Sequence, residues 1–293
     1  MNARSAIRES IAMLAAIAAF NFLFALSTLA ADIKGQVLGG GAPIAQSTVT
    51  LMQASAGAPK QLAQTKSDGS GNFTIHGTGA TDSSLYLVAL GGVPAAGRAA
   101  GDNPAIALIA VLGSKPPARV VINEMTTVAS IWTNAQFLDD ATLQGQPLGL
   151  RIAAGNVPNF VDLETGGWGD AIQNPLNSSQ TPTMANFATL ADLLSACVAR
   201  VKADACSSLF AAAAPPGGGP PTNTLNAAES IALNPWHQAG KIYDLLRQFY
   251  QVSPSNHMLA VPYMPYLNWA PSAWVLPLKF DGGGYVAGQG HVR

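Results

Sequence analysis

The chain has 293 residues, a formal net charge of −1 at pH 7 and only 11% charged residues. Hydrophobic residues make up 48% of it, a balance that excludes a disordered polar chain and predicts a folded protein. The near-neutral charge argues against a polyanion-binding surface, so we expect no nucleic-acid partner. After the first thirty residues, no segment has the eighteen or so consecutive apolar residues that a membrane helix needs.

The N-terminus has the three parts of a secretory signal peptide. Arg4 and Arg8 precede the apolar run IAMLAAIAAFNFLFAL, and Thr28 and Ala30 place small side chains at the −3 and −1 positions of a cleavage site. We therefore expect residues 1–30 to be removed and the protein to be secreted or periplasmic, with no membrane contact after cleavage. An uncleaved anchor helix is the alternative.

The chain contains two cysteines, Cys197 and Cys206. Export would place both in an oxidising compartment, so we expect a structural disulfide between them. A metal site would require more cysteine or histidine nearby, and a nucleophile would require an activating base. These two alternatives are weaker.

Residues 31–92 predict a small antiparallel β-sandwich. Five short β-rich runs (IKGQVL, STVTLMQAS, QLAQTKS, NFTIHG and SLYLVALGG) are separated by Gly- and Pro-rich turns. The alternation of Val49 with Leu51, and of Phe73 with Ile75, indicates one buried face on each strand.

This region resembles the carboxypeptidase regulatory-like, transthyretin-like β-sandwich. The resemblance rests on GQVLGGGAPIAQSTVTLMQA, on TKSDGSGNFTI and on SLYLVAL, and it covers about sixty residues. It implies a non-catalytic module for stability or contact.

Residues 93–119 are rich in Gly, Ala and Pro and end in SKPPAR, so we predict a connector there. Residues 120–280 then predict a mainly helical region, and the fold class is α+β. Asn123 is the expected N-cap of the first helix. The other helices are expected in NFATLADLLSACVARV, NAAESIALN and AGKIYDLLRQFY. The tract AAAAPPGGGPPTNT is expected to be an exposed loop.

The helical region resembles the segment that precedes β-propellers of the NHL or virginiamycin B lyase type. The resemblance rests on INEMTTVAS, on LADLLSACVAR with ADACSSLFAAA, and on TLNAAESIALNP. In such proteins a WVLPLKFDGGG-like string leads into the first blade, so residues 281–293 are interpreted as the truncated start of a blade. The resemblance implies that any lyase chemistry belongs to the propeller.

The residues that suggest chemistry have simpler structural interpretations. Asp68, Ser70 and Asn72 have the spacing of a calcium loop, but Gly79 stands where a glutamate is required, which favours a β-turn. Glu124 is either a buried acid or, as we favour, a partner for the N-terminus of its helix. Four histidines and the adjacent Asp139 and Asp140 form no metal-ligand or carboxylate-pair motif. We expect no metal and no cofactor.

The aromatic tail YMPYLNWAPSAW is the candidate interaction surface, with Tyr263, Tyr266, Trp269 and Trp274. Rings at these spacings suit stacking on sugar faces or a protein interface. The alternative, which we favour, is that they pack beneath proline-rich loops as a satellite core.

The sequence therefore predicts a non-catalytic exported binding or scaffolding protein of the cell envelope, with a protein or polysaccharide partner. Two alternatives stay open. One is the N-terminal part of a virginiamycin B lyase-like protein, and the other is a carbohydrate-binding module. Catalysis by residues that are distant in the sequence is also open, because one sequence gives no geometry.

Overall fold

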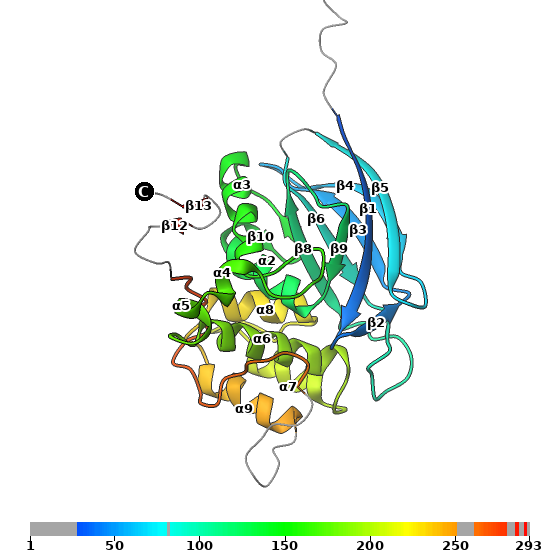
Figure 1. The fold of residues 1–293 in the computed structure, drawn as a ribbon. Helices are drawn as coiled ribbons and strands as arrows, with labels where there is room; N and C mark the ends of the chain where they lie inside the picture. The colour runs from blue at the N-terminus through cyan, green and yellow to red at the C-terminus, as the bar shows by residue number, and fades with distance from the viewer. Residues whose placement is uncertain (1–27, 81–82, 251–260, 280–284, 287–289, 292–293) are drawn as a thin grey trace, which may run out of the picture.

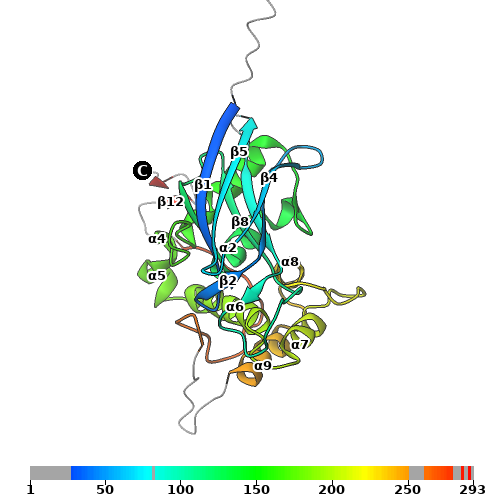
Figure 2. The ribbon, with the colours of Figure 1, turned by 90° about the vertical axis from the view of Figure 1, so that its right-hand side faces the viewer.

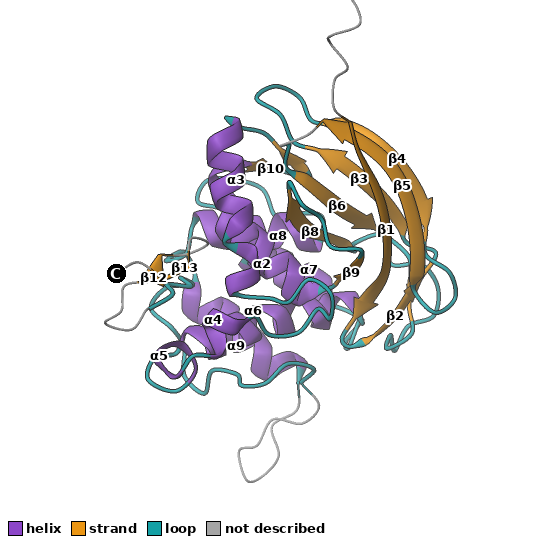
Figure 3. Ribbon diagram, turned by 45° about the horizontal axis from the view of Figure 1, so that its top comes forward, coloured by secondary structure: helices purple, strands orange, loops and turns teal. Residues whose placement is uncertain are grey.

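A computed structural model describes residues 28–80, 83–250, 261–279, 285–286 and 290–291. Strands occupy one side of the molecule and helices the other (Figure 1, Figure 3). The two halves share a single continuous core that runs from the sheets into the helices. The class is α+β, as predicted from the sequence.

The strands form two packed sheets, seen from the side in Figure 2. In the first sheet the order is β5-β1-β2-β7, with β9 parallel to β1, and in the second it is β4-β3-β6-β8. All five predicted strands are present. The strands are β1 (Thr28–Gly39), β2 (Ala42–Ala45), β3 (Thr48–Gln53), β4 (Lys60–Lys66), β5 (Asn72–Ala80), β6 (Leu85–Leu90), β7 (Val93–Pro94), β8 (Ala107–Gly113) and β9 (Arg119–Ile122).

The predicted alternation is confirmed in β5, where Phe73 and Ile75 are buried and Thr74 between them is exposed. In β3, Val49 and Leu51 are fully buried, but Thr50 between them is buried as well.

The turn between β4 and β5 is the predicted β-turn, with the Gly71 N–H donating to the Asp68 carbonyl, but it closes no hairpin because β4 pairs with β3 and β5 pairs with β1 in the other sheet. Asp68 Oδ1 accepts hydrogen bonds from the backbone N–H groups of Ser70 and Asn72, both at 2.8 Å.

The segment 93–119 is not only a connector, and the sandwich does not end at residue 92. Strands β7 and β8 lie inside this segment, and β9 begins at its last residue. Every residue of β8 is buried. A strand that is covered on both faces lacks the alternation of apolar and polar residues that marks a half-exposed strand. The sequence pattern therefore did not distinguish IALIAVLG from a connector.

Helices close the free edge of β8. Backbone N–H groups on alternate residues of this strand donate to hydroxyl oxygens: Ala107 to Thr224 at 3.0 Å, Ile109 to Thr127 at 3.1 Å and Val111 to Ser130 at 2.9 Å. An uncovered edge strand would expose these groups to pairing with another chain. The hydroxyls therefore bind the sandwich to the helical region along this edge.

We predict that Thr127→Val lowers the free energy of unfolding by about 1–3 kcal/mol, because the change of shape is small but leaves the Ile109 N–H buried without an acceptor. Urea unfolding followed by circular dichroism measures this. Thr133→Val is the matched control, since that hydroxyl bonds to groups within its own helix. Equal losses in both variants would contradict the role of the Thr127 hydroxyl at the strand edge.

The four predicted helices are present, and further helical turns join them. Asn123 caps the first helix as predicted, in a reciprocal capping box with Thr126. The principal helices are α2 (Glu124–Asn134), α3 (Pro147–Gly155), α6 (Thr183–Val198), α7 (Ala205–Ala212), α8 (Thr224–Leu233) and α9 (Ala239–Phe249). The shorter elements are η1 (Ala135–Phe137), β10 (Leu138–Asp139), β11 (Thr142–Leu143), η2 (Val157–Asn159), α4 (Asp170–Gln173), α5 (Pro175–Ser178), β12 (Tyr285–Val286) and β13 (Gly290–His291).

Helix α6 lies at the centre of the helical region, and almost all of its residues are buried. Helices α2, α7, α8 and α9 all pack against it or against one another. The tract between α7 and α8 is an exposed loop, as predicted: residues 216–220 are all exposed. Within the described residues, none of the helices combines the length and the hydropathy needed to cross a bilayer.

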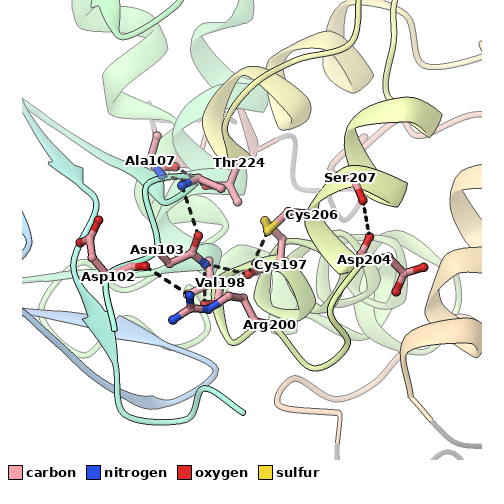
Figure 4. The surroundings of a disulfide bond; sticks show 11 residues. Asp102, Asn103, Ala107, Cys197, Val198, Arg200, Asp204, Cys206, Ser207 and Thr224 are labelled. Atoms are coloured by element: carbon pink, nitrogen blue, oxygen red, sulfur yellow. Dashed lines mark hydrogen bonds between the residues drawn. A yellow bond between two sulfur atoms is a disulfide. The ribbon is translucent and has the colours of Figure 1, made fainter. Parts of the chain in front are cut away.

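The predicted disulfide joins Cys197, at the end of α6, to Cys206 in α7, with Cα atoms 4.4 Å apart. Figure 4 shows that a loop of the sandwich reaches the same place. Asn103 Nδ2 donates to the carbonyls of Cys197 and Val198, both at 3.0 Å, which satisfies free carbonyls at the end of α6. Arg200 donates in return to carbonyls of the sandwich loop, including that of Asp102 at 3.2 Å.

Two expectations concern residues at the ends of the chain. The signal peptide falls largely on residues 1–27, which lie outside the described residues. Strand β1 begins at Thr28, and pairing with β5 continues from Ala31 onward, so cleavage after Ala30 would leave most of this strand pair in place. Of the segment 281–293, the structure describes only the short antiparallel pair β12 and β13.

Candidate functional site

An extended segment without helix or strand, residues 261–279, crosses the helical region; we call it the strap. In Figure 1 it is the dark orange segment beside α6 and α9. It contains all four residues of the predicted aromatic surface. The strap therefore places those rings on the helical half of the molecule.

Helix α6 holds the strap through a row of polar side chains at every third position. Thr183 donates to the Pro277 carbonyl at 2.9 Å, and Asn186 to that of Val275 at 3.4 Å. Thr189 accepts from the Leu267 N–H at 2.8 Å, and Asp192 from the Tyr263 N–H at 2.9 Å. Side chains three apart share one helix face, so the strap runs antiparallel to α6 along this row.

The four aromatic residues do not form one surface. Trp274 is fully buried, its backbone N–H donates to the Pro235 carbonyl at 2.9 Å, and its backbone carbonyl accepts from Trp132 Nε1 at 3.0 Å. Tyr263 and Tyr266 are half-buried against the core. Trp269 is the exposed member, at 58%. Both interpretations of the tail are thus represented: core packing for Trp274 and exposure for Trp269.

Trp269 borders a groove between the strap and the start of α6. The groove has a volume of about 320 Å³, near the lower end of the range of ligand pockets. Prolines and Val275 form its apolar walls, while hydroxyl, amide and ammonium groups come from Thr181, Ser272, Asn186 and Lys279. The groove therefore combines an aromatic face with hydrogen-bonding groups.

A second feature lies at the other end of the strap, where two acids are buried together. We call Glu124, Asp192, Tyr250 and Tyr263 the acid cluster. Glu124 accepts from the Tyr263 hydroxyl at 2.6 Å and from the Gly40 N–H at 3.0 Å. Gly40 lies in the turn between β1 and β2, with a φ of 58° in the left-handed region that favours glycine. Glu124 thus connects the sandwich, α2 and the strap.

Asp192 is also fully buried, in the middle of α6. Its Oδ1 accepts from Tyr263, while its Oδ2 is buried without a hydrogen-bond partner. The Tyr250 hydroxyl donates to the backbone carbonyl of Asp192 at 3.2 Å. A buried carboxylate oxygen without a donor is unfavourable as a charge, so the geometry favours the neutral acid at Asp192.

Burial sets the acidity of the cluster. Desolvation raises the pKa of Glu124 to about 7, against hydrogen bonds from Tyr263 and the backbone that lower it. Desolvation also raises the pKa of Asp192 well above its usual range, and the negative charge of Glu124 adds to that shift. The pKa values of both tyrosines rise through burial and through the same two acids. The cluster therefore retains a proton under conditions in which exposed carboxyls are ionised.

The other candidate residues from the sequence, the described histidines and the acids Asp139 and Asp140, do not lie in the groove or in the acid cluster. His76 is exposed and contacts Asp32, His237 contacts Gln238, and His257 lies outside the described residues. Asp139 and Asp140 are exposed, as expected, and lie near Glu229, whose pKa burial and these two charges raise to about 7. Among the described residues, no three His, Cys, Asp or Glu side chains are grouped in a way that would hold a metal ion.

Both interpretations of Glu124 apply, whereas sequence reasoning missed Asp192. Glu124 does sit in the first turn of its helix, as expected, but it is a buried acid that bonds to groups distant in the sequence. For Asp192 there was a signal: it is an isolated acid inside an apolar helix, in step with Thr183, Asn186 and Thr189. A polar residue kept on a buried helix face implies a partner from elsewhere in the chain.

No protein-family model and no curated protein matches the chain. Among solved structures, a 9R-lipoxygenase from Cyanothece PCC8801 is matched at 15% sequence identity with a TM-score of 0.22. The match covers 31% of this chain and 15% of the lipoxygenase chain. A TM-score this low carries no argument about fold or function. What the structure itself defines is an α+β protein with a β-sandwich joined to a disulfide-bonded helical region.

Proposed function

We propose that the protein is an exported, non-catalytic binding protein of the cell envelope and that its ligand is a polysaccharide. The observation that supports this most directly is the exposed indole of Trp269 at the edge of a groove with hydrogen-bonding groups. The C–H face of a sugar ring is apolar and complements the negative face of an indole, while its hydroxyls need donors and acceptors at the sides. The disulfide fits an exported protein.

Helix α6 and the core fix the position of the groove. Thr183 and Asn186 both bond to strap carbonyls, and the buried Trp274 anchors the same stretch of strap. A preformed groove loses little conformational freedom on binding, which favours affinity from a small contact area. The sandwich then serves as a scaffold to which the helical region is attached.

The test is retention on insoluble polysaccharides: cellulose, chitin and peptidoglycan sacculi. We expect at least one of them to retain the protein and Trp269→Ala to weaken that retention by about tenfold or more, the usual effect of removing a central aromatic contact. Trp236→Ala is the matched control, because Trp236 is 74% exposed and does not line the groove.

Two results would contradict the proposal. One is the absence of retention on all three materials, and the other is equal retention of the wild type and the Trp269→Ala variant. Loss of retention in the control variant alone would assign binding to the surface around Trp236 instead.

A further inference from the structure

The acid cluster connects α2, α6, the strap and the turn between β1 and β2 through hydrogen bonds to Glu124 and Asp192. Tyr263 donates its N–H to Asp192 on α6 and its hydroxyl to Glu124 on α2. Gly40, from the sandwich, bonds to the same Glu124 carboxyl, and Tyr250 follows the end of α9. The Tyr263 end of the strap is therefore attached through the two buried acids.

The described surroundings of the pair provide no positive charge to balance two carboxylates. The titratable groups that face it are Tyr250 from the end of α9 and Tyr263 from the strap, and the charges that act on these tyrosines are Glu124 and Asp192 themselves. The turn between β1 and β2 contributes only the backbone N–H of Gly40. Two charges here would repel each other in a medium that screens them poorly.

The hydrogen bonds of Glu124 differ from those of Asp192. Both Glu124 oxygens have donors, so this side chain tolerates a charge. Asp192 has one oxygen without a donor, which is the natural place for a proton. With one proton present, the pair carries a single negative charge and every bond to Tyr263 is retained.

We infer that the acid cluster is a proton-operated clasp, which holds the Tyr263 end of the strap while the Glu124–Asp192 pair keeps a proton and releases it when that proton is lost to solvent. Release exposes both carboxyls to water, which removes their mutual repulsion and their desolvation. The inference does not depend on the ligand of the groove, although Trp269 lies on the same strap and would move with it.

The direction of the effect follows from linkage. In the released state both carboxyls are solvated and titrate in their ordinary ranges, whereas in the clasped state burial raises the pKa of Asp192 well above that range and the pKa of Glu124 to about 7. Between these values release gives up a proton, so the equilibrium constant for release rises with pH, by up to tenfold per unit. The raised pKa of Asp192 extends the effect to higher pH.

Hydrogen exchange of the full chain between pH 5 and pH 8 tests this, after correction for the intrinsic exchange rate. We expect protection of the peptide that contains Tyr263 and Leu267 to fall by more than tenfold with rising pH, while β6 amides in the core stay more strongly protected than the strap at every pH. Glu124→Gln and Asp192→Asn mimic the protonated acids, so each should flatten the pH dependence in the strap.

Glu229→Gln is the matched control, because this acid also has a pKa raised to about 7 but has no bond to the strap. It should leave the pH dependence in the strap unchanged. Strap protection that is constant from pH 5 to pH 8, or an equal pH dependence in the wild type and both cluster variants, would overturn the inference. Strap amides that exchange at the same rate as β6 amides at every pH would overturn it too, since that result indicates that the strap opens only by global unfolding.

Discussion

Trp274→Ala is expected to lower the free energy of unfolding by about 3–5 kcal/mol, the usual cost of removing a large buried aromatic side chain. Trp274 is fully buried and packs in the core that the strap shares with the helices. The strap has no helix or strand of its own. Its attachment therefore depends on this side chain and on the polar row of α6.

Urea unfolding followed by far-ultraviolet circular dichroism measures the effect without relying on tryptophan fluorescence. Trp274→Phe should cost less than Trp274→Ala, because it fills most of the volume and removes an indole N–H that is buried without a partner. Trp236→Ala, at an exposed position, should change stability by no more than about 0.5 kcal/mol. A loss below 1 kcal/mol for Trp274→Ala would show that the strap is not part of the cooperative core.

The second expected result is that the folded state loses stability as the pH rises from about 4.5 to about 7. The pKa of Glu124 is raised to about 7 by burial, so the folded chain binds more protons than the unfolded chain in this window. The protonated acid therefore stabilises the fold fully below pH 4.5, and this contribution is lost as the pH approaches 7. A shift of this size corresponds to about 3 kcal/mol.

Glu229 has a pKa raised to the same value and contributes in the same window. Asp192, whose pKa is raised well above its usual range by burial, contributes with the same sign. Glu124→Gln, Asp192→Asn and Glu229→Gln separate the three contributions, since each removes one titrating group. We expect Glu124→Gln to remove a larger share than Glu229→Gln, because the Glu124 carboxyl is fully buried, and to make the protein more stable than the wild type at pH 8. Stability that rises between pH 4.5 and pH 7 in the wild type would show that the acids are solvated in the folded state.

The proposed clasp and the proposed binding groove both involve the strap. Tyr263, near the start of the strap, bonds to the two buried acids, and Trp269, in its middle, is exposed beside the groove. If both proposals hold, binding at the groove and the protonation of the pair are coupled through one segment. Measuring polysaccharide retention at pH 5 and pH 8 then reports on that coupling.

Patterns within short stretches of sequence were sufficient for much of the fold. The alternation around Val49 and Phe73, the cap at Asn123 and the apolar face around Cys197 each depend on neighbours a few residues away. The disulfide was predictable because the chain has two cysteines and is expected to be exported to an oxidising compartment. Strand β8 was obscured for the opposite reason, since it is buried on both faces by distant elements.

The sequence by itself determined the α+β class, the five first strands and the main helices, because these follow from hydrophobic periodicity. It also determined the cysteine pair, because the chain has two cysteines and is expected to be exported. Only the tertiary structure decided that Glu124 and Asp192 meet at Tyr263, which is 139 and 71 residues away from them respectively. It also decided that Trp274 is buried while Trp269 is exposed. Burial and contact at such separations depend on how the chain packs, and that information is not present in any local pattern.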